Sequence, residues 1–232
     1  MSKEEAASPA LVSEKEAKRQ AFLSVVRVAI ALRQSPRTVW VAMTYFHRFF
    51  LDSNVWEFPP CLFAATCLLV ASKLTEKHIN MRDLVNAFQA TMYPTAPPQH
   101  LAVGVPRIKA AVVLQEQHLL RRLRFQLDVV TPHAFLFHYS KSFGFPAPSL
   151  RLAYGMLNDT LASGVCIRFP AHHLALAALV VANRQLGETQ TLPATMGLSA
   201  QRKWYTLCDV TERQLSDASA AILSAYSDYP VE

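Results

Sequence analysis

PPCLFAATCLLVASK, residues 59–73, carries no charge before Lys73. The segment is apolar around its whole circumference, which is typical of a helix enclosed by other helices. Its two leading prolines fit the first helical turn, where no backbone N–H has to be donated. Because about 20 residues are needed to cross a bilayer, the segment is too short to span a membrane. It predicts a buried central helix in an all-helical fold.

The same pattern recurs 111 residues further along the chain. At this offset Pro59 falls on Pro170 and Lys73 falls on Arg184, with apolar residues in register between them. The register continues upstream into the preceding helix, so two helices and their connection are duplicated together. A single offset of this size differs from the repeats of 20 to 50 residues that build solenoids. We therefore predict an all-α chain of two tandem five-helix lobes.

Apolar residues at helical spacing predict the remaining helices. The proline-rich stretch 91–106 and residues 189–198 are predicted to be surface loops, and residues 125–127 a short extended link. Residues 1–13 are expected to form a flexible tail, the first lobe to cover residues 14–130, and the second to cover residues 131–232. The expected helices are 14–33, 36–51, 59–73, 81–90 and 106–124 in the first lobe, and 131–141, 149–163, 170–186, 201–208 and 211–227 in the second.

Composition excludes several classes of protein. Hydrophobic residues make up 51% of the 232 residues, which is too many for a disordered chain. Only six glycines are present, which leaves little room for a phosphate-binding loop. The net charge of +6 is spread along the chain, and direct binding of nucleic acid is not expected. The four cysteines lack CxxC spacing and are predicted to be buried free thiols.

Motifs of the common enzyme classes are missing. The sequence contains no GxSxG, no HExxH and no glycine-rich loop before a helix. His172 and His173 are adjacent, so they cannot share one face of a helix as metal ligands do. We expect no catalytic residue, metal, cofactor or membrane span, and expect instead a surface that another protein binds.

Glu116 is an acidic residue within an apolar stripe. It lies four residues from Val112 and four from Leu120 on the predicted helix 106–124. A buried lone carboxylate is costly, so Glu116 needs a cation or backbone N–H groups as partners. Lys73, at the outer end of the central helix, is the best candidate to lie near it.

Three segments together resemble the cyclin box. They are Tyr45-Phe46-His47-Arg48-Phe49-Phe50, the sequence Ala71-Ser72-Lys73-Leu74-Thr75-Glu76, and Glu116 followed by Phe125 and Leu127. The resemblance covers nearly the whole chain from about Glu14 and implies two tandem cyclin-box lobes. Within the family, the chain is most similar to the transcriptional cyclins of the cyclin K and cyclin T type. That similarity extends to Pro132-His133-Ala134-Phe135, Leu157-Asn158-Asp159-Thr160-Leu161 and Arg202-Lys203-Trp204-Tyr205.

The resemblance implies a binding surface for a cyclin-dependent kinase. In this family the matching lysine and glutamate grip the kinase C-helix, which assigns Lys73 to backbone carbonyls and Glu116 to backbone N–H groups of the kinase. Leu74, Leu120, Phe125 and Leu127 would supply an apolar floor. Glu76 matches the second glutamate of the KxEE pattern, and Thr75 replaces the first.

Other features depart from the cell-cycle cyclins. These cyclins usually carry an acidic residue at the position of His47, paired with an arginine of an MRAIL segment, and both features are missing here. Their hydrophobic docking patch for substrates is therefore not expected. We predict that His47 packs as a hydrogen-bonded core histidine and does not act as a switch.

The resemblance implies a regulatory subunit that activates a transcriptional Ser/Thr kinase acting on the C-terminal domain of RNA polymerase II. The expected location is the nucleus, alone or together with the cytoplasm. Contacts with other parts of the transcription machinery would also fit. Two alternatives stay open at this point. One is a cyclin whose kinase serves cell division or trafficking. The other is a scaffold like transcription factor IIB, which would need a concentrated basic face for DNA.

Overall fold

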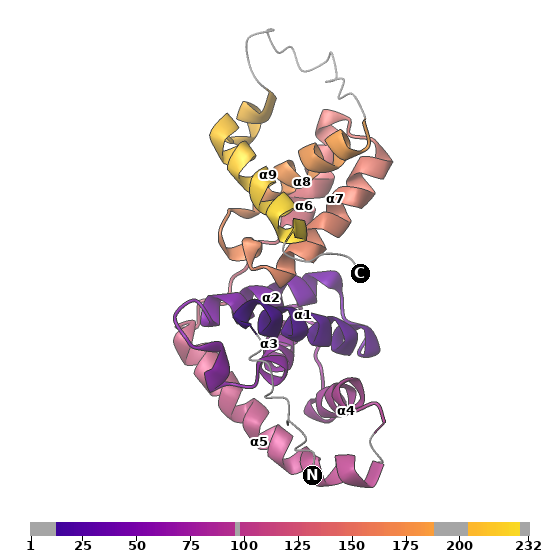
Figure 1. The fold of residues 1–232 in the computed structure, drawn as a ribbon, viewed down its shortest axis with the longest axis vertical. Coiled ribbons are helices and arrows are strands. Elements are labelled where there is room, and N and C mark those ends of the chain that lie inside the picture. The colour runs from indigo at the N-terminus through magenta and orange to yellow at the C-terminus, as the bar shows by residue number, and fades with distance from the viewer. Residues whose placement is uncertain (1–12, 96–97, 188–203, 228–232) are drawn as a thin grey trace, which may run out of the picture.

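The computed structural model describes residues 13–95, 98–187 and 204–227. These residues form helices, turns and irregular segments, and no strand occurs among them. Figure 1 shows two groups of helices stacked along the long axis, which we call the first lobe (α1–α5) and the second lobe (α6–α9). The predicted all-helical fold is confirmed.

The first lobe consists of α1 (Glu14–Ala31), α2 (Pro36–Phe49), α3 (Pro60–Leu74), α4 (Met81–Met92) and α5 (Pro98–Arg122), with the short 3-10 helix η1 (Val55–Glu57) before α3. The second lobe consists of α6 (Pro132–Phe143), α7 (Ala147–Asp159), α8 (Ala171–Gln185) and α9 (Glu212–Ser227), with the 3-10 helices η2 (Thr160–Ala162), η3 (Val165–Ile167) and η5 (Trp204–Cys208). In the described residues, η5 is a 3-10 helix where an α-helix over 201–208 was expected. The predicted tail and the predicted loop 189–198 lie outside the described residues.

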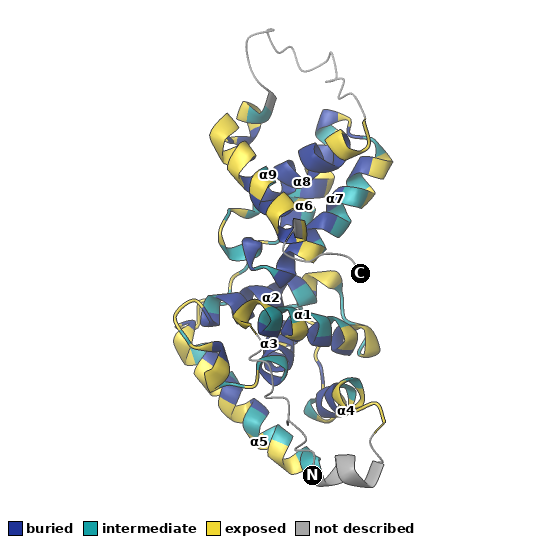
Figure 2. Ribbon diagram, viewed as in Figure 1, coloured by how far each residue is buried: buried dark blue, intermediate teal, exposed yellow. Residues whose placement is uncertain are grey.

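The predicted central helices are α3 and α8. Their first and last residues are separated by 111 positions, which is the offset of the sequence repeat. Each begins directly after a proline, Pro59 for α3 and Pro170 for α8. All residues from 62 to 72 of α3 are buried, and so are all residues from 173 to 183 of α8. In Figure 2 both helices are dark blue at the centre of their lobes. In each lobe, the sequence segment that is apolar on all sides therefore forms a helix that is enclosed on all sides.

One prediction about the first lobe is wrong. The sequence predicts a surface loop over 91–106 and a helix that starts at Pro106, yet α5 already begins at Pro98 and contains Pro106 in its interior. An interior proline removes one helical hydrogen bond and costs roughly 3 kcal/mol. The first turns of α5, before Pro106, pack closely against α4. A Cβ placed on Gly104 would lie 3.2 Å from the side-chain nitrogen of Gln89 on α4. Tertiary packing can override a local breaker in this way.

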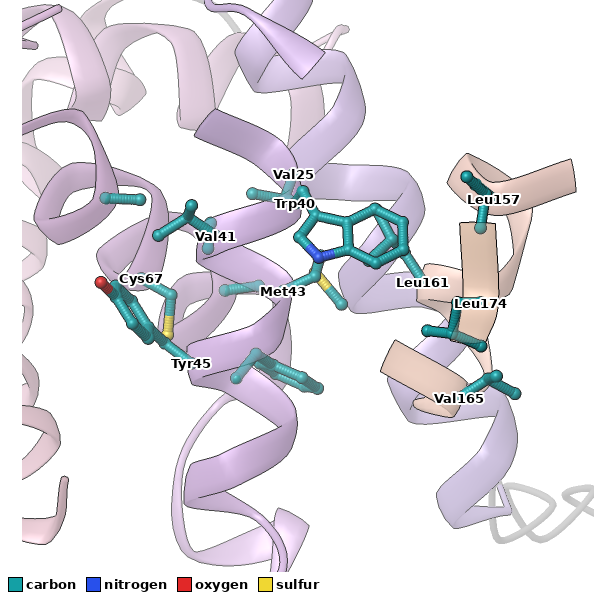
Figure 3. Close-up of a cluster of buried hydrophobic side chains, with 14 of the residues drawn as sticks. Val25, Trp40, Val41, Met43, Tyr45, Cys67, Leu157, Leu161, Val165 and Leu174 are labelled. Atoms are coloured by element: carbon teal, nitrogen blue, oxygen red, sulfur yellow. The ribbon is translucent and has the colours of Figure 1, made fainter. Parts of the chain in front are cut away.

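The two lobes share a buried junction. Trp40 on α2 is buried, and its ring meets the ring of His133 on α6 edge to face, with centroids 5.2 Å apart. Figure 3 shows the Trp40 indole reaching toward Leu161 and Leu174 of the second lobe. These residues belong to one hydrophobic cluster that runs through both lobes. The orientation of the lobes is therefore set by packed side chains and not by the linker alone.

Candidate functional site

The end of α3 is fixed by hydroxyl groups. Thr75 caps the helix, and its hydroxyl bonds to the Ala71 carbonyl and to the Thr38 hydroxyl, each at 3.0 Å. The Ser72 hydroxyl donates to the Leu69 carbonyl at 2.7 Å and accepts from the backbone N–H of Ile79 at 3.3 Å. Lys73 thus projects from a helix end whose following loop is tied back to the helix.

Lys73 and Glu116 form an ion pair between α3 and α5. The Lys73 Nζ lies 2.5 Å from the Glu116 Oε1, although the two residues are 43 positions apart in sequence. The Glu116 side chain is 19% exposed and that of Lys73 is 49% exposed. The predicted proximity of the two residues is confirmed. The pair is reached by solvent, so it contributes modestly to stability, and both charges are accessible to a partner.

A buried hydrogen bond sets how α5 lies on α3. The Thr66 hydroxyl donates to the Gln115 Oε1 at 2.9 Å, and both side chains are buried. Gln115 directly precedes Glu116, so this bond fixes the rotation of α5 that turns Glu116 toward Lys73. Sequence reasoning missed this pair. The available signal was a single hydroxyl, Thr66, in the middle of an otherwise apolar run.

After α5 the chain reverses through two left-handed residues. Arg124 has φ 50° and Phe125 has φ 57°, and the Phe125 N–H donates to the Leu120 carbonyl at 3.1 Å. Residues other than glycine adopt this conformation at a cost of roughly 1–2 kcal/mol. The prediction of an extended link is therefore wrong at Phe125. The reversal turns the Phe125 ring outward, where it is 69% exposed.

Leu127 is anchored by Tyr45. The buried Tyr45 ring places its hydroxyl 2.5 Å from the Leu127 carbonyl, to which it donates. Burial raises the pKa of the Tyr45 hydroxyl to about 12, so it remains a donor at neutral pH. Sequence reasoning listed Tyr45 as part of a motif and did not assign it this role. Its bond holds the segment after α5 against α2.

Four of the seven predicted site residues are connected by these contacts and by one turn of α5. Lys73 meets Glu116, and Leu120 follows one turn along α5, is half-buried and accepts from Phe125. Leu74 is next to Lys73 and is 49% exposed. Glu76 lies just beyond α3 with φ 59° and is exposed, and none of the contacts described above joins it to the other site residues. The connected residues are Lys73, Glu116, Leu120 and Phe125, whereas Leu127 is held by Tyr45.

The exposed apolar side chains at this site resemble an interaction surface. Val113, which lies about one turn before Glu116 on α5, is 46% exposed, in addition to Leu74 and Phe125. Exposed apolar side chains on elements that also carry accessible charges are typical of a protein-binding face. Among the described residues, no group of three or more metal-ligating side chains occurs. The helices in the described ranges also include none that is both long and apolar enough to span a membrane.

Comparison with known proteins agrees with these features. The family model of the cyclin N-terminal domain matches residues 5–128. Cyclin-K of Danio rerio is 27% identical over 195 residues, which cover 82% of this chain and 45% of that protein. The CTD kinase subunit beta of Schizosaccharomyces pombe is 26% identical over 214 residues, covering 90% of this chain and 61% of that protein. Cyclin-T1-3 of Oryza sativa subsp. japonica is 26% identical, covering 82% and 38%.

Solved structures share the fold. A chain of the yeast RNA Pol II CTD kinase CTDK-1 complex matches with a TM-score of 0.73 at 18% identity, covering 93% of this chain and 66% of that chain. A chain of the CAK complex of Chaetomium thermophilum matches with a TM-score of 0.65, also at 18% identity, covering 91% and 63%. The chain spans less than half the length of the first curated relatives that it matches. Because the family model matches more than half of its residues, this chain belongs to the cyclin family.

Proposed function

We propose that this chain is the non-catalytic regulatory subunit that binds and activates a cyclin-dependent Ser/Thr kinase of the transcriptional class. The observation that carries the proposal is the accessible Lys73–Glu116 pair between α3 and α5, flanked by exposed Leu74 and Phe125. Cyclin family membership gives this surface its expected partner. The proposed kinase-binding residues are Lys73, Leu74, Glu76, Glu116, Leu120, Phe125 and Leu127.

The pair is suited to gripping a helix of the kinase. A lysine ammonium carries three N–H donors and a carboxylate accepts at both oxygens, so each residue keeps capacity after pairing with the other. Lys73 would donate to backbone carbonyls and Glu116 would accept from backbone N–H groups, both as charge-assisted bonds. Because the pair is already formed in the free chain, little side-chain ordering is needed on binding.

Activation would follow from stabilising one state of the kinase. In protein kinases a lysine–glutamate ion pair forms only when the C-helix is in its active position. A cyclin surface that binds the C-helix only in this position shifts the kinase toward the active state by the difference in affinity. Leu74, Leu120 and Phe125 would add apolar contacts at this interface.

The proposed substrate is the C-terminal domain of RNA polymerase II. Support comes from the relatives, which include a CTD kinase subunit beta, and from the fold of the CTDK-1 complex. A nuclear location would follow from this role. A kinase that serves cell division or trafficking is the competing assignment, and the choice of substrate separates the two.

The test is to capture the kinase and measure its activity. The tagged chain is immobilised and incubated with extract of the cells from which it comes, and bound kinases are identified by mass spectrometry. The eluate is then assayed on a peptide of the polymerase C-terminal repeat and on histone H1. We expect one stoichiometric kinase that prefers the polymerase repeat.

Variants link the result to the site. The double variant Lys73→Ala/Glu116→Ala should lower kinase capture by about tenfold or more, because two charge-assisted contacts are lost. The matched control is Arg213→Ala/Asp217→Ala on α9, an exposed pair at 3.9 Å, which should bind as the unmodified chain does. Capture that is unaffected by the first variant would refute the assigned surface. A bound kinase that prefers histone H1 would refute the transcriptional assignment.

A further inference from the structure

A second candidate surface lies where the two lobes meet. A cleft of about 510 Å³ opens between α2, residues 128–130 of the linker, η3 and the start of α8. Trp40 and Arg48 line it from the first lobe, and Arg168 and Phe169 line it from the second. Its volume is in the range of ligand sites in proteins. The cleft exists only because the lobes are held in one orientation, and none of the proposed kinase-binding residues lines it.

The cleft carries two guanidinium groups without carboxylate partners in the described part of the chain. Arg48 is half-buried, and its Nη1 donates a long hydrogen bond of 3.5 Å to the Asp128 carbonyl. Arg168 is exposed, and its guanidinium carbon lies 5.6 Å from the centroid of the Phe169 ring. Within the described residues, no carboxylate oxygen lies within 4.0 Å of either guanidinium. A half-buried cation with one weak contact favours an anionic ligand.

Apolar walls flank these charges. Leu51 is 66% exposed and Val130 is 67% exposed, and both line the cleft. Large apolar side chains that are exposed beside a groove are often covered by a bound partner. Asp128 also lines the cleft and is its only acidic residue, so the lining carries a net positive charge. The positive charge and the apolar walls of the cleft together fit a peptide in which a carboxylate side chain lies beside an apolar side chain.

The frame of the cleft is rigid before any ligand binds. Tyr45 holds the Leu127 carbonyl at the start of the linker, and the Trp40 ring is packed against His133. His47, one residue before Arg48, bonds to the Leu161 carbonyl of the second lobe at 2.6 Å. A preorganised site loses less conformational entropy when a ligand binds. An open cleft with two exposed apolar walls suits an extended peptide better than an enclosed small molecule.

We propose that the cleft between the lobes binds an acidic peptide segment of a partner protein. A glutamate or aspartate of that segment is held between Arg48 and Arg168, and a neighbouring apolar side chain packs on Leu51 and Val130. The guanidinium groups bind the carboxylate through paired N–H donors, a geometry in which lysine is a poor substitute. This site is separate from the kinase-binding surface, and its test does not require a kinase.

The probe is a short fluorescein-labelled peptide of alternating Glu and Leu, titrated with the full chain and followed by fluorescence anisotropy. Three further peptides keep the length and replace Glu by Gln, Leu by Gly, or Glu by phosphoserine. We expect the Glu-Leu peptide to bind at least about tenfold more tightly than the Gln-Leu and Glu-Gly peptides. Equal binding of Glu-Leu and Gln-Leu, or binding of the phosphoserine peptide alone, would overturn the proposal.

Matched variants separate the cleft from general attraction to a basic protein. Arg168 lies on the surface, and Arg168→Gln should weaken binding of the Glu-Leu peptide by about tenfold. Arg151→Gln on α7 removes the same charge from an exposed position outside the cleft and should leave binding unchanged. Arg48→Gln tests the second arginine of the cleft and should also weaken binding of the Glu-Leu peptide, and circular dichroism confirms that this variant is folded. Equal losses for Arg168→Gln and Arg151→Gln would overturn the proposal.

A charge exchange gives a positive readout. Arg168→Glu should reject the Glu-Leu peptide and gain affinity for a Lys-Leu peptide, because the guanidinium that faced the carboxylate is replaced by an acid. A gain for Lys-Leu at Arg168→Glu, absent at Arg151→Glu, places the ligand charge beside residue 168. No gain at either position would contradict the assigned contact.

Discussion

His47 of the first lobe lies 2.6 Å from the carbonyl oxygen of Leu161 in the second lobe, through its Nε2. The imidazole is buried, and burial lowers the pKa of His47 to about 4. As predicted from the sequence, His47 packs as a hydrogen-bonded core histidine. The contact joins α2 to η2 across 114 positions of sequence, so the state of one side chain affects how the lobes are held.

Stability should fall as the pH drops below the range of a free histidine. The His47 pKa is about 4 in the folded chain and about 6.5 in the unfolded chain, so the unfolded chain binds more protons between these values. The contribution is fully present above about pH 6.5 and declines toward pH 4, with a loss of about 2 kcal/mol by pH 5. Urea unfolding at pH 7, 6 and 5 measures it.

A conservative variant isolates this effect. His47→Gln keeps a side-chain donor toward Leu161 and has no proton to gain, so its stability should change less with pH than that of the unmodified chain. His78→Gln replaces an exposed histidine and should leave the pH profile as it was. An unchanged pH slope in His47→Gln would show that other groups, such as His133, dominate acid destabilisation.

Gly164 is a position where only glycine fits. Its φ is +74°, and an added Cβ would lie 3.0 Å from the His47 Nδ1. Gly164→Ala should therefore destabilise the chain by roughly 2 kcal/mol or more, from backbone strain and from displacement of His47. Gly155→Ala is the control, because its Cβ meets nothing within 4 Å on α7 and should stabilise by about 0.5–1 kcal/mol. Thermal unfolding of both variants gives the comparison.

Thr75 stands where the family pattern has a glutamate, and its hydroxyl is used inside the fold. Thr75→Val keeps the shape and removes the bonds to Ala71 and Thr38, which should cost about 1–2 kcal/mol. Thr91→Val removes a single bond to Ala87 at the end of α4 and should cost less than about 1 kcal/mol. Equal losses in urea unfolding would mean that the bond to Thr38 does not stabilise the end of α3.

Phe125 combines high exposure with a left-handed backbone. Phe125→Gly removes the ring and suits φ 57°, so the variant should be no less stable than the unmodified chain while kinase capture falls. Phe137→Ser on α6, where the ring is 53% exposed, is the control and should leave capture unchanged. The two readouts are urea unfolding and the capture assay. Full capture by Phe125→Gly would remove this residue from the proposed interface.

Local sequence was enough to predict the elements that depend on neighbouring residues. The apolar run after Pro59 and its copy after Pro170 predicted α3 and α8, because a helix with no polar face has to be enclosed on all sides. The prediction that Lys73 lies near Glu116 also succeeded, since a carboxylate in an apolar stripe needs a partner and few cations end a buried helix. The boundary between the lobes near residue 130 stays a prediction.

Features that depend on residues far apart in sequence could not be predicted and emerge from the packing of the helices. Pro106 reads as a helix start, yet α5 begins at Pro98 and packs near Gln89 of α4. The left-handed turn at Phe125 and the bond from Tyr45 to the Leu127 carbonyl, 82 positions apart, have no local signature. Local preferences act over a few residues, whereas these contacts form only when lobes and helices have packed, and their energy then outweighs the local cost.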